Sequence, residues 1–443
     1  MKKDLTQGNI TKTMLMFACP MILGNLLQQC YNIADTLIVG RFLGPAALAG
    51  VGSAYTLMTF LTSIIIGLCM GSGTVISVWF GKKDMQKMKN SIVISFLCIA
   101  AITAVINLFV LGAMDFILKA LHVPDEIYYL MRDYLWIIFF GIFFVFLYNY
   151  FAFLLRALGN SIVPLYFLGL ASVINIVLDI LFVVVLKFGI KGAAWATVIA
   201  QGVCAVGIVT YVWQKEPGLH PKREDLTTSK QNLLEILENS AAACVQQSVM
   251  NFGILMIQGL VNSFGTTVMA AFAAAVKIDS FAYMPAQEFG NAFSLFISQN
   301  FGGGKRERVQ EGIKQAIKIA FCFCITISIC IFILAPYLME IFVEYQETEI
   351  IRTGVDYLRI EGSFYCGIGV LFLLYGFYRG IEKPYMSLIL TILSLGTRVM
   401  LAYLLAPIPF IGVWGIWWAI PVGWLLADLV GIICIKGNSF YSI

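Results

Sequence analysis

The chain has 443 residues, of which 60% are apolar and only 12% are charged. Soluble domains have roughly 45–50% apolar and about 25% charged residues, so this composition excludes a water-soluble fold and predicts a polytopic membrane protein. The net charge of +4 is small and the basic residues lie in short loops, so no nucleic-acid partner is expected. Two histidines are too few for a His-ligated metal or a His-dependent triad. We therefore expect neither an enzyme nor a cofactor.

Apolar runs separated by breakers predict twelve membrane-spanning helices, since each span needs about 20 apolar residues. The most polar connection, 214–232, divides them into an N-lobe at 1–213 and a C-lobe at 233–443. The predicted fold class is an all-α polytopic membrane protein. The expected spans are 12–40, 46–80, 91–114, 130–156, 161–186, 190–213, 233–262, 266–300, 314–340, 353–380, 384–406 and 411–435.

The distribution of basic residues predicts the orientation of the chain. Of the 29 Lys and Arg residues, twenty fall on the side of the membrane that holds the N-terminus and seven on the other. The positive-inside rule then places both termini in the cytoplasm. We expect a multi-pass protein of the inner (plasma) membrane, whose first apolar run is an uncleaved span rather than a signal peptide.

The two halves of the chain are related by an internal repeat. Three residues of the first half recur 223 positions later, where Arg156, Gly192 and Trp195 correspond to Arg379, Gly415 and Trp418. Six spans per half is an even number, so both halves enter the membrane from the same side. This predicts two six-helix bundles related by a pseudo-two-fold axis along the membrane normal, an arrangement typical of secondary transporters.

Two carboxylates inside the spans need an explanation, because an ionised side chain at the bilayer centre costs about 2.5–3.5 kcal/mol on insertion scales. Asp35 lies in the first span and Asp179 in the fifth. Asn175 is four residues before Asp179 and so shares its helix face. Counting from the outer turns at about 1.5 Å per residue places Asp35, Asp179 and Thr197 at similar depths. We expect these four residues to converge in the outer half of the first bundle.

Such a group of oxygens suits either of two coupling ions. Paired carboxylates in a site of low dielectric can hold and release a proton, and oxygen-only ligation suits a hard cation such as Na⁺. The alternative is that both carboxylates only hydrogen-bond to neighbouring helices. The equivalent positions of the second half lack this acidic group. The sequence therefore predicts a coupling site for H⁺ or Na⁺ in the first half alone.

Other polar residues within spans are candidates for lining a substrate cavity. They are Gln29, Tyr31, Asn32, Gln246, Asn251, Lys277, Asp279, Glu288 and Arg398. For several of them, bonds between helices are an equally good interpretation. Pro20 removes a backbone hydrogen bond fifteen residues before Asp35, and it is either a bending point of the first span or a static kink.

Three motifs of the chain resemble those of a known transporter family. The run Gln28–Asp35, followed by Val39–Arg41, resembles the first-span signature of the multidrug and toxic compound extrusion (MATE) family. Asn175–Asp179 resembles the fifth-span motif of that family, and Gln299–Gly302 resembles the end of its eighth span. The resemblance covers essentially the whole chain, including the twelve spans and the repeat.

This resemblance implies an exporter of amphipathic, often cationic, small molecules that is driven by inward movement of H⁺ or Na⁺. In the bacterial branch that depends on an N-lobe aspartate, the matching positions are Asp35, Asn175, Asp179 and Thr197. Pro20 would match a bending point. The expected protein is a multidrug efflux antiporter that works by alternating access, as a monomer in the lipid bilayer. The alternative is a flippase for a lipid-linked substrate, which would need a more basic cavity.

Overall fold

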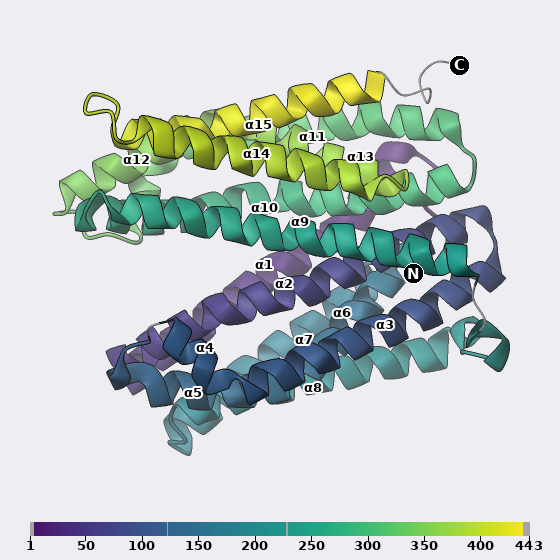
Figure 1. The fold of residues 1–443 in the computed structure, drawn as a ribbon, viewed down its shortest axis with the longest axis horizontal. Coiled ribbons are helices and arrows are strands. Elements are labelled where there is room, and N and C mark those ends of the chain that lie inside the picture. Colours follow the sequence, from purple (N-terminus) through teal and green to yellow (C-terminus); the bar gives the residue numbers. More distant parts are fainter. Residues whose placement is uncertain (1–3, 122, 227–228, 437–443) are drawn as a thin grey trace. The chain divides into compact units, whose positions relative to one another are not determined.

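The computed structural model describes residues 4–121, 123–226 and 229–436, and the two chain ends, for which the sequence predicts a cytoplasmic location, lie outside these ranges. The described residues form helices and no strands (Figure 1). The α-helices are α1 (Ile10–Leu43), α2 (Pro45–Lys82), α3 (Met85–Gly112), α4 (Met114–Ala120), α5 (Asp125–Phe140), α6 (Ile142–Ala157), α7 (Ile162–Asp179), α8 (Ile190–Lys215), α9 (Lys230–Asn262), α10 (Thr266–Gly302), α11 (Arg306–Glu340), α12 (Thr348–Ser363), α13 (Tyr365–Gly380), α14 (Pro384–Leu405) and α15 (Val413–Lys436). Shorter turns of helix are η1 (Ile180–Val185), η2 (Pro217–Leu219) and η3 (Arg223–Leu226).

The helices account for the predicted membrane spans. Ten of those described are long and apolar enough to cross a membrane. Two further pairs are bent, α5 with α6 by 47° and α12 with α13 by 52°, and they bring the number to twelve if each pair is one span. The bends fall at Gly141 and Phe364. The all-α polytopic fold class is confirmed.

The outward faces of several spans are apolar. On α3 the side chain of Leu108 is 72% exposed, and on α11 that of Ile333 is 62% exposed. Water would oppose such exposure over whole helix faces, whereas lipid tails solvate these side chains well. By contrast, most of the residues in the apolar part of α2 are buried, so α2 forms the centre of its bundle.

The described chain forms two compact units, whose boundaries fall inside helices. The first unit holds Leu23–Cys244 together with Asp4. The second holds Leu5–Ile22 and the chain from Val245 onward. The N-terminal part of α1 thus packs with the second unit, and the N-terminal part of α9 packs with the first. The sequence places the lobe boundary in the 214–232 linker, and compactness divides the chain instead within these two helices.

A close approach of two backbones holds the N-terminal part of α9 in the first unit. A Cβ atom on Gly67 would lie 2.5 Å from Cα of Cys244, and one on Gly71 would overlap the backbone of Asn239. Only glycine allows α2 and α9 to come this near, as in other membrane helix pairs with small residues at the contact.

The core of the second unit contains stacked aromatic rings. Phe272 of α10 lies parallel to Trp417 of α15, with ring centroids 5.5 Å apart. Tyr357 of α12 meets both rings edge-on, at 5.4 and 4.9 Å. All three side chains are at least 99% buried. This packing fixes the last turns of α12, the helix that carries Glu361.

Candidate ion-coupling site

Asp35 and Asp179 lie close together in the first unit. Asp179 is the last residue of α7 and is fully buried, while Asp35 in the second half of α1 is partly buried. Their carboxyl groups interact directly with one another. The backbone changes directly after Asp179 into the π-helix η1, a distortion that is frequent at functional sites.

Asn175 and Thr197 complete the group. The side-chain amide of Asn175 donates to Oγ1 of Thr197 at 3.3 Å, and that hydroxyl donates to the carbonyl of Ala193 at 3.1 Å. Both side chains are more than 90% buried. Because Asn175 lies one helical turn before Asp179 on α7, the Asn175–Thr197 pair adjoins the two carboxylates.

The acceptor oxygens of this site lack donors. Oδ1 of Asn175, Oδ1 of Asp35 and both carboxylate oxygens of Asp179 accept no hydrogen bond from the described part of the chain. Two ionised carboxylates have no hydrogen to share, and buried acceptors without partners are costly. A proton between the carboxyls, or a cation bound by the oxygens, would remove this cost.

Two tyrosines stand next to the carboxylates. Tyr134 of α5 is 3% exposed and interacts electrostatically with both Asp35 and Asp179. Tyr31 lies one helical turn before Asp35 and interacts with that carboxyl and with Tyr134. The sequence names Tyr31 as a cavity residue but misses Tyr134. A tyrosine in an apolar run looks like ordinary core, and no motif marks its hydroxyl.

The remaining candidates on α1 pair with one another or stand at a boundary. The side-chain amide of Asn32 donates to Oε1 of Gln29 at 3.3 Å, and both side chains are partly buried. Pro20 lies inside α1, just before the helix passes from the second unit to the first between Ile22 and Leu23.

A second group of buried ionisable residues lies in the second unit. Tyr365 of α13 donates a hydrogen bond to Oδ1 of Asp279 on α10 at 2.6 Å. Glu361 of α12 interacts with Asp279, with the guanidinium of Arg398 on α14, and with the hydroxyl of Tyr357. We call these five residues the second-unit cluster. With both carboxyls ionised and the guanidinium protonated, the cluster has a net charge of about −1.

The carboxylates of the second-unit cluster lie at other positions than those equivalent to Asp35 and Asp179, which are the positions that the sequence comparison of the two halves considers. Asp279 and Arg398 are among the predicted cavity residues, but Glu361 is missed. In the sequence Glu361 follows Asp356 and Arg359 and looks like one more charge at the end of a span. The structure buries Glu361 to 97%, and among the described residues neither Oε2 of Glu361 nor Nε of Arg398 has a hydrogen-bond partner.

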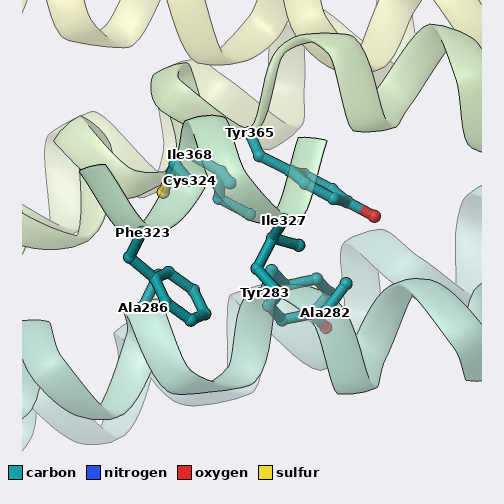
Figure 2. A pocket seen from close by; sticks show the side chains of 8 residues that line it. All are labelled: Ala282, Tyr283, Ala286, Phe323, Cys324, Ile327, Tyr365 and Ile368. Atoms are coloured by element: carbon teal, nitrogen blue, oxygen red, sulfur yellow. The ribbon is translucent and has the colours of Figure 1, made fainter. Parts of the chain in front are cut away.

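A small pocket adjoins the second-unit cluster. It lies between α10, α11 and α13 (Figure 2). Tyr365, which donates to Asp279, forms part of its wall, as do Tyr283 and Phe323. The other lining residues are Ala282, Ala286, Cys324, Ile327 and Ile368.

The other second-unit candidates make contacts between helices or lie at the surface. Gln246 of α9 is buried and accepts a hydrogen bond from Ser387 of α14 at 3.2 Å. Glu288 accepts from the side-chain amide of Asn291, which in turn binds Arg379. The remaining two are Asn251, which is partly buried, and Lys277, which is exposed.

Comparison with known proteins agrees with this architecture. The model of the MatE family matches residues 20–181 and 242–404, one segment in each half. The chain belongs to the MatE family. It is therefore a MATE transporter, as its motifs predict.

Relatives of this MATE chain match it over most of their own length. The probable multidrug resistance protein YpnP of Bacillus subtilis is 31% identical over 391 residues, covering 88% of this chain and 87% of the relative. The probable multidrug resistance protein NorM of Thermotoga maritima is 25% identical and covers 95% and 90%. The crystal structure of a MATE protein in complex with MaL6 superposes with a TM-score of 0.93 at 25% identity, over 99% of both chains.

Proposed function

We propose that this chain is a secondary active multidrug antiporter that exports amphipathic, mostly cationic compounds in exchange for H⁺ or Na⁺. The observation that carries the proposal is the group of Asp35, Asp179, Asn175 and Thr197, in which Oδ1 of Asp35, Oδ1 of Asn175 and both carboxylate oxygens of Asp179 accept no hydrogen bond from the described residues. Multidrug export as the activity is supported by relatives named as multidrug resistance proteins.

In the proposed cycle, the coupling ion binds between the carboxyls of Asp35 and Asp179. Two neighbouring ionised carboxylates repel each other, and binding of one proton or one Na⁺ reduces this repulsion. For Na⁺, Oδ1 of Asn175 and Oγ1 of Thr197 add further oxygen ligands of the kind that hard cations prefer. Since Asp35 lies on α1 and Asp179 on α7, occupancy of the site changes the force between these two helices.

The energy available is adequate for such a cycle. One charge that crosses a potential of 100 mV releases about 2.3 kcal/mol. Because the carboxyl pair is negative when empty and less so when occupied, its affinity for a cationic substrate nearby falls when the coupling ion binds. Alternating access then follows if the ion binds from outside and leaves inside.

The test is ethidium movement in proteoliposomes, with pH and Na⁺ gradients imposed separately. Wild-type protein should move ethidium under one of the gradients, and Asp35→Asn should abolish the gradient-dependent part because the amide keeps the volume but loses the charge. Asp179→Asn should act similarly.

Asp133→Asn is the matched control for these variants. Asp133 lies on α5 of the same unit and forms an exposed ion pair with Lys191 at 3.1 Å, a contact of little energetic weight. Full gradient-driven transport by a well-folded Asp35→Asn protein would exclude the coupling role. No ethidium movement under either gradient would argue against drug export, and lipid-linked substrates would then be tested.

A further inference from the structure

The segment that precedes α1 is held by an unusually complete set of hydrogen bonds within the second unit. The Leu5 amide donates to Oε1 of Gln299 at 3.2 Å, and the Leu5 carbonyl accepts from Nδ2 of Asn300 at 3.2 Å. The Leu5 side chain is fully buried, as are Gln299 and Asn300. These two polar residues belong to the eighth-span motif that the sequence shares with the MATE family, and the proposed coupling site gives that motif no role.

Two cations hold the carbonyls that follow. Arg308 donates to the carbonyls of Gln7 and Gly8, both at 2.7 Å, and also to that of Leu5. Lys305 donates to the carbonyl of Thr6 at 2.6 Å. Four consecutive carbonyls are thus bound by residues at the end of α10 and the start of α11. Hydrogen bonds from charged donors are the stronger ones, and a guanidinium is suited to binding two acceptors at once.

The segment before α9 is held in a comparable way within the first unit. Gln86 of α3 donates to Oδ1 of Asp225 at 3.1 Å, and Ser91 of α3 donates to Oδ1 of Asn232 at 3.1 Å. Asp225 is 1% exposed although it is an acidic residue in a polar linker. In each repeat, therefore, the entry to the first helix is anchored on helices of the unit with which that entry packs: on α10 and the start of α11 for α1, and on α3 for α9.

Helix α1, whose entry is anchored in this way, also passes from one unit to the other. The half of α1 before Leu23 belongs to the second unit, and the half that carries Asp35 belongs to the first. If its N-terminal end is fixed, relative motion of the units must bend α1 or pull the anchored segment away. Pro20 lies near the crossing point and lacks the backbone hydrogen bond that resists bending.

We propose that Leu5–Gly8, held by Gln299, Asn300, Lys305 and Arg308, is a strap that fixes α1 to the second unit, so that the state of Asp35 is transmitted to that unit through α1. This inference rests on the proposed antiport. It assigns the strap to the conformational step and not to substrate binding. Loss of the strap therefore lowers the rate of transport and leaves the affinity for substrate unchanged.

The test compares Arg308→Gln with wild type in three measurements. Hydrogen exchange at the Leu5–Gly8 amides should become at least about tenfold faster, because bonds from a charged donor to three carbonyls are lost. Gradient-driven ethidium transport should fall at least about fivefold, while the Kd for ethidium at equilibrium stays within about twofold. Arg308→Lys keeps the charge but loses the planar guanidinium that binds several carbonyls at once, and it should give intermediate exchange and transport.

Lys314→Gln is the matched control, because it removes a positive charge from the same helix. Lys314 is exposed and makes only a 3.9 Å pair with Glu311. Its exchange, transport and Kd should all match those of wild type.

Several outcomes would overturn the strap. They are unchanged exchange in Arg308→Gln, faster exchange with wild-type transport, and loss of ethidium affinity together with a lowered melting temperature. The last would show general damage to the fold. Absence of transport by the wild-type protein under every gradient would instead refute the proposed antiport, so the two failures are distinguishable.

Discussion

Replacing Arg398 by methionine tests the electrostatics of the second-unit cluster. Arg398 is 91% buried, and its guanidinium interacts with both Asp279 and Glu361. Methionine retains much of the apolar stem but leaves two buried carboxyls without that cation. Removing one partner of a buried pair costs about 3–5 kcal/mol. Because Nε of Arg398 makes no hydrogen bond, we expect the lower end of this range, about 3 kcal/mol.

The assay is thermal melting and denaturant unfolding of the purified protein in detergent. Arg398→Met should melt well below wild type, and adding Glu361→Gln to it should restore most of the loss, because the double variant has the same cluster charge as wild type. With the Glu361→Gln single variant as the fourth protein, these form a double-mutant cycle that isolates the interaction between the two side chains. Lys277→Met is the control, since it removes a cation from an exposed position. Equal melting of Arg398→Met and wild type would refute the reasoning.

Two further predictions concern packing and pH. Gly67→Val should destabilise the protein by about 1–3 kcal/mol or more, because the new side chain meets the backbone of Cys244 on α9, whereas Gly52→Val on the same helix has open space and should melt like wild type. A hydrogen bond from Arg132 holds the pKa of Asp115 below its ordinary value, so this contact should persist at neutral pH and be lost as the pH falls through that lowered pKa. A spin label in α4 should therefore become more mobile in acid, and Asp115→Asn should show the mobile spectrum already at pH 7; identical spectra for both proteins at pH 7 would contradict the assignment.

The membrane architecture could be predicted because long apolar runs have few alternative structures in a bilayer. The bends at Gly141 and Phe364 could not, since neither residue is a proline and the sequence of each bent pair is interpreted as one continuous span. The division of the chain within α1 and α9 was equally hidden. Hydrophobicity shows that a helix is buried or faces lipid, but it does not say which neighbours each half of that helix contacts.

More of the candidate ion-coupling site than of the second-unit cluster could be predicted from the sequence. Asp35 and Asp179 stand alone in apolar runs, so distance from the outer turns gives their depth directly. Tyr134 was missed because a tyrosine within an apolar run does not change the hydropathy pattern, so its hydroxyl gives no signal in the sequence. Glu361 was missed because α12 carries several charges, and only the packing of Tyr357 against Phe272 and Trp417 determines which face of α12 turns inward.

The packing of α1 with the second unit also bears on how the chain is made. Leu5 leaves the ribosome well before Gln299, the partner of its amide, which is synthesised 294 residues later. The start of α1 therefore lacks its native contacts with the second unit until most of the chain has been synthesised and inserted. Two polypeptides produced by cutting the gene at the 214–232 linker would each lack a helix segment that the other supplies, and each half would reach its native packing only when both are expressed together.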